Sequence, residues 1–152
     1  MMEVPKQAFP PAPGPERYVL EDQIGFRLRK AHQRATDVFN AVMGGFDVTP
    51  TQFAALAKLD DVGPISQNQL GRLIAMDPAT IFGVVGRLAK RGYVRQSVDE
   101  SDARVVLVLL TDEGRAAVQR MRAVAAEVSR RTLEPLTAKE ADTLLKLVAK
   151  LG

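Results

Sequence analysis

The positively charged side chains between residues 87 and 95 carry the clearest chemistry in this sequence. Arg87, Lys90, Arg91 and Arg95 fall within residues 78–98, a stretch that contains no acidic residue. Guanidinium and ammonium groups pair readily with phosphate oxygens. The stretch therefore predicts a surface that contacts a nucleic acid.

A short helix is predicted to position these cations. Asp77 is a favourable N-cap residue, Pro78 suits the first helical position, and Gly92 suits a helix end that needs a positive φ. Apolar residues recur at helical spacing and predict one buried stripe, formed by Ile81, Val84, Val85 and Leu88.

The opposite face of this helix is made of small residues, with Ala79, Gly83 and Gly86 in line with Lys90. Each exposed helical glycine costs about 1 kcal/mol relative to alanine, which indicates that another molecule approaches the backbone there. A small face flanked by cations suits a helix that lies in a DNA major groove.

The composition favours a single soluble domain with a mainly aliphatic core. The chain has 152 residues, and Lys plus Arg exceed Asp plus Glu by 21 to 18, a balance that permits nucleic-acid binding without requiring it. Apolar runs are shorter than the roughly 20 residues of a membrane span, and the N-terminus lacks a signal pattern, so we expect a cytoplasmic location.

Several classes of chemistry are excluded or disfavoured. Cysteine is absent, which excludes disulfides, thiolate metal sites and thiol-based redox sensing. The sequence has a single histidine and lacks a P-loop, a glycine-rich dinucleotide loop and paired metal-ligand spacing. We therefore expect neither an enzyme nor a cofactor or metal site.

The remaining elements predict a mainly α-helical protein with a small β-hairpin, an α+β fold. Residues 1–16 are rich in proline and predict an extended or flexible arm. Capping patterns at Thr49, Ser66, Thr111 and Thr137 mark helix starts. The predicted order is helices at about 17–43, 50–61, from 66, 78–91, 112–132 and from 138, with strands at 93–97 and 105–110 around an acidic tip at 99–104.

The last predicted helix is rich in leucine and needs a partner surface. Packing on the first and fifth helices of the same chain is one alternative, and packing across a two-fold axis is the other. We favour the dimer, because the long first helix and the two last helices form a second apolar layer. The candidate dimer contacts are Tyr18, Leu20, Leu133, Leu136, Leu144, Leu145, Val148 and Leu151.

Residues 91–114 resemble the MarR family of bacterial winged helix-turn-helix transcription regulators. The resemblance rests on Gly92-Tyr93-Val94, on Asp99, on Asp102-x-Arg104 at the hairpin tip, and on Leu110-Thr111-x-x-Gly114. It implies an obligate homodimer that binds a pseudopalindromic operator, usually as a repressor. It also implies a winged helix-turn-helix unit at about 47–111 and dimerisation helices at about 17–45 and 112–152, within one domain of residues 17–152.

The resemblance also assigns roles in DNA binding. One recognition helix per subunit enters the major groove, while Arg104 on the wing reaches a flanking minor groove and Asp99 and Asp102 brace the wing. Phe82 departs from the polar or basic residues common at its position, and either contacts a thymine methyl group or packs against the neighbouring helix. The candidate DNA contacts are Ser66, Gln67, Gln69, Ala79, Thr80, Phe82, Gly83, Arg87, Lys90, Arg91, Arg95 and Arg104.

Many family members release DNA when a small phenolic or aromatic carboxylate binds. Here Arg27 and His32 could anchor a carboxylate and a phenol, with Phe39 and Phe53 as apolar wall. The alternative is that the arginines of the first helix form a solvated face and His32 fills space. A second function stays open, that of a dimeric ligand-binding or interaction module that has lost specific DNA binding.

Overall fold

The computed structural model describes residues 14–152, and these fall into two compact units. One unit ends at Gln33 and the other comprises Arg34–Gly152. Helix α1 (Ile24–Met43) begins in the first unit and ends in the second. Most of the predicted proline-rich arm, residues 1–13, lies outside the described residues.

The first unit starts with two short 3-10 helices, Pro15–Arg17 and Leu20–Asp22, where the sequence predicts the beginning of the long helix. Gln23 has an extended backbone (φ −80°, ψ 137°), and its carbonyl accepts the bond from the Arg27 N–H at 3.0 Å. The α-helical hydrogen-bond pattern therefore begins at Ile24. The prediction of a helix from residue 17 is wrong by about two turns, because Val19 and Gln23 keep extended backbones.

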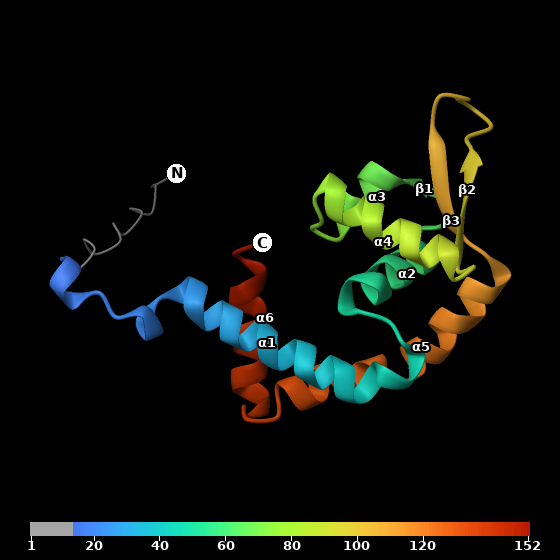
Figure 1. Cartoon of the computed structure of the whole chain (residues 1–152). Coiled ribbons are helices and arrows are strands. Elements are labelled where there is room, and N and C mark those ends of the chain that lie inside the picture. The colour runs from blue at the N-terminus through green and yellow to red at the C-terminus, as the bar shows by residue number, and fades with distance from the viewer. Residues whose placement is uncertain (1–13) are drawn as a thin grey trace, which may run out of the picture. The chain divides into compact units, whose positions relative to one another are not determined.

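The second unit contains most of the helices. After the 3-10 helix η3 (Gly44–Phe46), α2 spans Pro50–Val62, α3 spans Gln67–Leu73 and α4 spans Pro78–Lys90. The long helix α5 (Asp112–Thr132) and the shorter α6 (Ala138–Ala149) follow the hairpin. Figure 1 shows α6 following α5 at the end of α5 that lies away from the hairpin.

The sheet has three antiparallel strands in the order β1–β3–β2. Strands β2 (Val94–Val98) and β3 (Val106–Leu110) form the predicted hairpin, in which Val94 pairs with Leu110 and Val98 with Val106. Strand β1 (Ile65–Ser66) is a finding that the sequence did not predict. Two residues are too short for an alternating pattern, and β1 exists because Ile65 pairs with Val108.

The predicted helix caps are present. Thr49 and Thr137 form complete capping boxes with Gln52 and Glu140, which satisfy otherwise free N–H groups of the first turn. Ser66 accepts a bond from the Gln69 N–H, but the Gln69 side chain accepts from the Ser66 hydroxyl rather than from its backbone. Half of that box is therefore absent, and Ser66 is at the same time a strand residue.

The core of the second unit is mainly aliphatic and surrounds α4. The predicted α4 stripe is buried, with Ile81 and Leu88 at 0% exposure and Val84 and Val85 at no more than 3%. It packs within one cluster that also receives side chains from α2, α3, β3 and α5. Burial of this stripe fixes the rotation of α4, so its small-residue face points outward.

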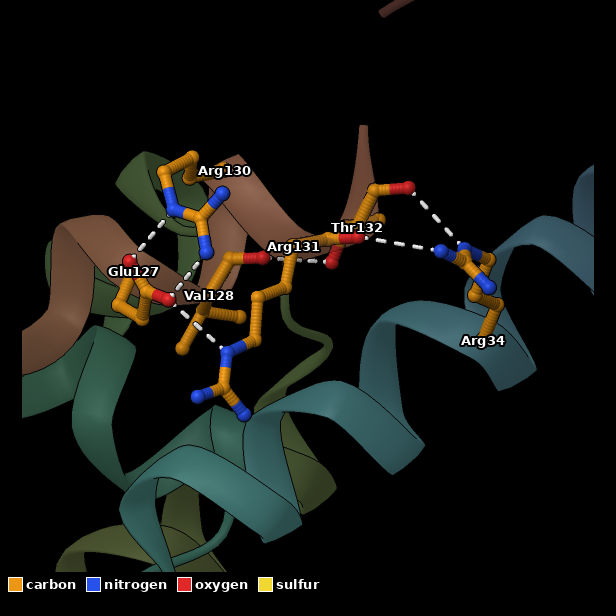
Figure 2. Close-up of polar contacts among 6 residues, drawn as sticks. All are labelled: Arg34, Glu127, Val128, Arg130, Arg131 and Thr132. Atoms are coloured by element: carbon orange, nitrogen blue, oxygen red, sulfur yellow. Dashed lines mark hydrogen bonds and ion pairs between the residues drawn. The ribbon is translucent and has the colours of Figure 1, made fainter. Parts of the chain in front are cut away.

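Two arginines connect α5 to the helices beside it. Arg122 on α5 donates to the Ala57 carbonyl at 2.7 Å and pairs with the Asp60 and Asp61 carboxylates at 3.3 and 2.8 Å. Arg34 on α1 donates to the carbonyls of Arg131 and Thr132 at 3.1 and 3.0 Å (Figure 2). Both carbonyls lie in the last turn of α5, where that of Arg131 also accepts from the Glu134 N–H at 3.3 Å, so Arg34 adds charged hydrogen bonds at the end of that helix.

Candidate nucleic-acid interface

Helices α3 and α4 form a helix-turn-helix whose turn has a fixed backbone. Ala75 adopts a left-handed conformation (φ 55°), and the Met76 N–H donates to the Gly71 carbonyl at 2.8 Å. Asp77 then caps α4 by accepting from the Thr80 N–H at 2.8 Å and from its hydroxyl at 3.0 Å. These bonds lower the pKa of the Asp77 carboxyl, the bond from the Thr80 N–H contributing most.

The outward face of α4 is open, as the small residues predict. Ala79, Thr80 and Gly86 are exposed, and a Cβ added to Gly86 would meet no atom within 4 Å in the described residues. A Cβ at Gly83 would lie 3.4 Å from the Arg87 Nη1, so the Arg87 side chain runs along the helix over that glycine. The two glycines therefore differ: one leaves the backbone open, and the other makes room for an arginine.

Phe82 is exposed on this helix. Its side chain is 71% accessible, which excludes packing against the neighbouring helix as the reason for a phenylalanine there. Two hollows, of about 480 and 310 Å³, adjoin the ring. Both are lined by Gln67 from α3 and Gln96 from β2, together with valines, so the ring lies beside both amide and apolar groups.

The tip of the hairpin is held by two aspartates. Asp99 accepts from the backbone N–H and the hydroxyl of Ser101 at 3.0 and 2.9 Å. Asp102 accepts from the Arg104 N–H at 3.0 Å and pairs with both sides of the Arg104 guanidinium at 3.0 and 3.1 Å. The guanidinium lowers the pKa of the Asp102 carboxyl, and the carboxylate raises the pKa of Arg104.

Arg104 is thus presented in a defined direction although its side chain is 90% exposed. The larger hollow beside Phe82 is also lined by Arg104, which brings the hairpin tip and the recognition helix to one surface. Lys90 at the end of α4 and Arg95 in β2 are also exposed. Among residues 14–152, Arg87, Lys90 and Arg95 form no ion pair with a carboxylate, so their charges remain available.

Arg91 has a structural role that the sequence did not predict, and its predicted contact with DNA stays a prediction. Its guanidinium donates to the carbonyls of Phe46 and Asp47 and to the Tyr93 hydroxyl, the last at 3.2 Å. It also stacks 4.7 Å from the Tyr93 ring centre. Asp47 has a left-handed backbone (φ 52°), so Arg91 holds a strained turn between α1 and α2 rather than extending outward with the other cations.

The packing between the hairpin and the start of α5 explains why Gly92 and Gly114 of the motif are glycines. Gly92 has a φ of +76°, as predicted for the end of α4. A Cβ at Gly114 would lie 1.9 Å from the Tyr93 carbonyl oxygen, a distance that no side chain permits. Thr111 joins these segments, because its hydroxyl donates to the Gly92 carbonyl at 2.5 Å and accepts from the Gly114 N–H at 3.0 Å.

The predicted ligand residues have separate environments. Phe39 is only 6% exposed and contacts Phe53 with ring centres 6.1 Å apart, so its ring belongs to the core and offers little surface to a ligand. Arg27 pairs with Asp22 at 3.5 Å within the first unit, and the His32 side chain is exposed there. The roles of Arg27 and His32 in ligand binding stay predictions.

A cleft of about 560 Å³ lies elsewhere in the second unit and was not predicted from the sequence. It is lined by Asn40 from the last turn of α1, by Gly44 from η3, by residues 47–49 and Gln52, and by the last turn of α4 with Arg87 and Lys90. This volume is within the range of small-ligand sites. Sequence reasoning missed it because its lining comes from segments about 40 residues apart.

The predicted dimer residues are largely in solvent. Tyr18 and Leu20 of the first unit are 59% and 49% exposed. In the second unit, Leu133 and Leu136 are half-buried, while the large apolar side chains at the end of the chain are all at least 42% exposed: Leu144, Leu145, Leu147, Val148 and Leu151.

Two further observations concern the described part of the chain. Within residues 14–152, no group of three His, Asp or Glu side chains is arranged to hold a metal ion. None of the helices formed by these residues is long and apolar enough to cross a membrane.

A helix-turn-helix followed by a hairpin wing, with cations at both, defines a DNA-binding protein of the winged-helix class. The family model described as "MarR family" matches residues 48–106. The chain is 39% identical over 134 residues to the HTH-type transcriptional repressor NicR of Pseudomonas putida, covering 88% of this chain and 85% of NicR.

Solved structures agree with this match. A probable transcriptional regulator from Pseudomonas aeruginosa is 50% identical, with a TM-score of 0.83, over 88% of this chain and 100% of that one. BpsR of Bordetella bronchiseptica, whose DNA binding is regulated by 6-hydroxynicotinic acid, is 34% identical with a TM-score of 0.83, over 88% and 96%. The chain belongs to the MarR family of DNA-binding transcription regulators.

Proposed function

We propose that this chain is a homodimeric repressor that binds a pseudopalindromic operator and leaves it when a small aromatic carboxylic acid binds. The observation that carries the proposal is the outward face of α4, which is small, cation-flanked and adjacent to the Arg104 tip. A helix of this kind fits the width of a major groove.

The four cations contact different parts of the DNA in this proposal. Arg87, Lys90 and Arg95 neutralise phosphates on either side of the groove, which makes binding depend steeply on salt. Arg104 enters the flanking minor groove, where the negative potential favours an arginine. Its pair with Asp102 holds the guanidinium in one orientation before DNA binds and so limits the conformational entropy that binding costs.

The homodimer is supported by the exposed leucines of α6. A 12-residue helix with this much exposed apolar surface is not stabilised by its own chain. A second copy of α6 and its neighbours would cover it. Two recognition helices would then be held at a fixed spacing, which is the geometric requirement for reading two half-sites.

The proposed effector class is supported by the ligand of a relative and by the side chains that line a cleft in this chain. BpsR, 34% identical, responds to an aromatic carboxylic acid. In this chain the cleft at the last turn of α4 combines Arg87 and Lys90 with the Asn40 and Thr49 side chains. A carboxylate that pairs with these cations competes with phosphates for the same charges, so binding of the acid and of DNA would exclude each other. Arg27 and His32 remain the alternative anchor.

DNA binding is tested by selecting duplexes from a random-sequence library with the wild-type protein. We expect one enriched palindrome, a dissociation constant that rises steeply with salt, and about tenfold weaker binding by Arg104→Ala with unchanged thermal stability. Arg115→Ala, on the exposed start of α5, is the matched control. Failure to enrich any sequence would support the module without specific DNA binding.

Effector binding is tested by thermal stabilisation and by release of the selected duplex, using benzoate, hydroxybenzoates and 6-hydroxynicotinic acid. Two variants separate the two anchors: Asn40→Ala lies on the cleft, and His32→Ala lies on the first unit. We expect Asn40→Ala to raise the acid concentration needed for release. If His32→Ala alone has that effect, the anchor is on the first half of α1.

A further inference from the structure

The recognition helix α4 carries an exposed aromatic ring that binding to phosphates does not require. Phe82 is 71% exposed, while the other large apolar side chains of α4 are at most 3% exposed. An exposed ring contributes nothing to the core, and apolar surface gains free energy only when a partner removes it from water. The ring therefore requires an apolar group on whatever lies against α4.

The surroundings of the ring define that partner further. The hollow towards the hairpin tip is lined by Phe82, by polar side chains that include Gln67, Gln96 and Arg104, and by Val105, Val106 and Val108. The hollow on the other side shares the ring and both glutamines, and it adds Arg95. The partner must accordingly be anionic at its edge, while its interior offers hydrogen-bonding groups next to a small apolar group.

The major-groove edge of an A·T pair has this chemistry. Thymine carries a C5-methyl group beside its O4 acceptor, and adenine offers an N7 acceptor beside an N6 donor, which a glutamine amide can bind with two hydrogen bonds. Phosphates supply the anionic edge that Arg95 and Arg104 match. Cytosine lacks the methyl group, so an apolar contact at this point distinguishes T·A from C·G.

We propose that Phe82 reads the C5-methyl group of a thymine in each half-site, with the Gln67 and Gln96 amides facing the edges of the same and the adjacent base pair. This inference rests on the proposed function, because it requires that α4 enters the major groove. It adds a residue that selects a base. Phe82 makes the protein prefer thymine at one position, whereas the cations contribute affinity that does not depend on sequence.

The open backbone at Gly86 fits this arrangement. Gly86 lines the same hollow as Phe82, and a Cβ at that position would project into open space. A glycine one turn after the ring lets the helix approach the groove floor closely, which an apolar contact with a methyl group requires. The ring and the glycine are thus two parts of one contact.

The test uses the duplex that the wild-type protein selects, with its thymines replaced one at a time by deoxyuridine. This replacement removes the methyl group and keeps all Watson–Crick hydrogen bonds. At one thymine per half-site we expect the wild-type protein to bind about fourfold more weakly, as expected for one lost apolar carbon. Replacing the symmetry-related thymine as well should multiply the effect.

Protein variants at Phe82, measured with both duplexes, complete a double-mutant cycle between the ring and the thymine methyl group. We expect Phe82→Ala to bind the thymine duplex more weakly than wild type and to bind the thymine and deoxyuridine duplexes equally. Phe82→Leu, which keeps an apolar side chain, should retain part of the preference. Val62→Ala, another exposed apolar position at the end of α2, should behave as wild type. Circular dichroism and urea unfolding should be unchanged for Phe82→Ala, because the ring is exposed.

The outcomes separate this inference from the function on which it rests. A wild-type protein that enriches no sequence overturns both. A protein that enriches a palindrome but tolerates deoxyuridine at every thymine overturns the role of Phe82 alone. A Phe82→Ala variant that still discriminates thymine from deoxyuridine as strongly as wild type also overturns it, since another residue then contacts the methyl group.

Discussion

Helices α4 and α6 carry apolar stripes of the same kind in sequence, but the structure gives the two stripes opposite environments. In α4 the stripe is at most 3% exposed and forms the centre of the core. In α6 the apolar side chains are 42–58% exposed. The difference shows that helical periodicity identifies an apolar face without identifying which surface covers it. The α4 stripe is covered by its own chain, while the α6 stripe is exposed in the single chain and would be covered in the proposed dimer.

The environment of each apolar stripe also determines how the opposite face of that helix is held. Because the α4 stripe is buried, the helix has one possible rotation, and its small face, Phe82 and cations are held in a single direction. The covered stripe is therefore what makes the reading surface rigid. The apolar side chains of α6, in contrast, are exposed in the single chain. In the proposed dimer a second copy covers them, which would couple dimerisation to the spacing of the two recognition helices.

The same truncation in the two stripes gives the largest expected contrast. Leu88→Ala in α4 should lower the free energy of unfolding by about 2–5 kcal/mol, because it leaves a cavity in a fully buried site. Leu145→Ala in α6 should change the stability of the folded chain far less and instead raise the dimer dissociation constant. Urea unfolding and analytical ultracentrifugation measure the two effects. Equal loss of stability in both variants would show that α6 is covered within its own chain.

A smaller contrast separates the two kinds of arginine. Arg91→Gln should lower the free energy of unfolding by about 1–3 kcal/mol, because it removes charged hydrogen bonds to the Phe46 and Asp47 carbonyls. Arg95→Gln should leave stability unchanged and weaken DNA binding. Urea unfolding with titration of the selected duplex checks both. A stable Arg91→Gln protein with weakened DNA binding would return Arg91 to the DNA contacts.

The smallest expected effect concerns the acid stability of α5. Arg130 and Arg131 donate to the Glu127 carboxylate at 2.6–2.9 Å (Figure 2), and these bonds lower its pKa from 4.5 to about 2. A lowered pKa in the folded state gives stability that is present above pH 4.5 and is lost as the pH falls towards 2. Screening by solvent keeps the contribution small.

Thermal unfolding of wild type and Glu127→Gln between pH 2 and 7 measures this contribution. We expect the wild type to be more stable above pH 4.5, with the difference disappearing towards pH 2 and shrinking in high salt. A difference that stays constant with pH would mean that the carboxylate is not the group responsible. Asp142, which pairs with Lys146 on α6 at 2.9 Å, offers a matched control as Asp142→Asn.

Local patterns were sufficient to predict most of the fold. Thr49, Asp77, Thr111 and Thr137 cap helices as predicted, because a cap depends on a side chain and an N–H group three residues away. The α4 stripe was predicted from helical spacing, and the two hairpin strands were predicted from the acidic tip between them, both of which are local patterns. The start of α1 was misplaced, since the extended backbone at Gln23 has no local signal of that kind.

The tertiary structure decided the role of each charged and aromatic side chain. Arg87 and Arg91 are four residues apart on one helix end, but only Arg91 meets the Phe46 and Asp47 carbonyls, which come from about 45 residues earlier. Phe39 and Phe82 are both phenylalanines on helices, and one lies in the core while the other is in solvent. β1 likewise exists only through its pairing with β3.

The sequence by itself therefore determined most of the helices and the two hairpin strands, and through its motif the family, because both depend on interactions between near neighbours along the chain. The start of α1 and the strand β1 are the exceptions. The surface available for DNA was decided by contacts between distant segments. These contacts bind the Arg91 guanidinium to the Phe46 carbonyl and leave Phe82 exposed. Such contacts depend on the three-dimensional packing of α4 against the core, which the order of residues along α4 does not specify.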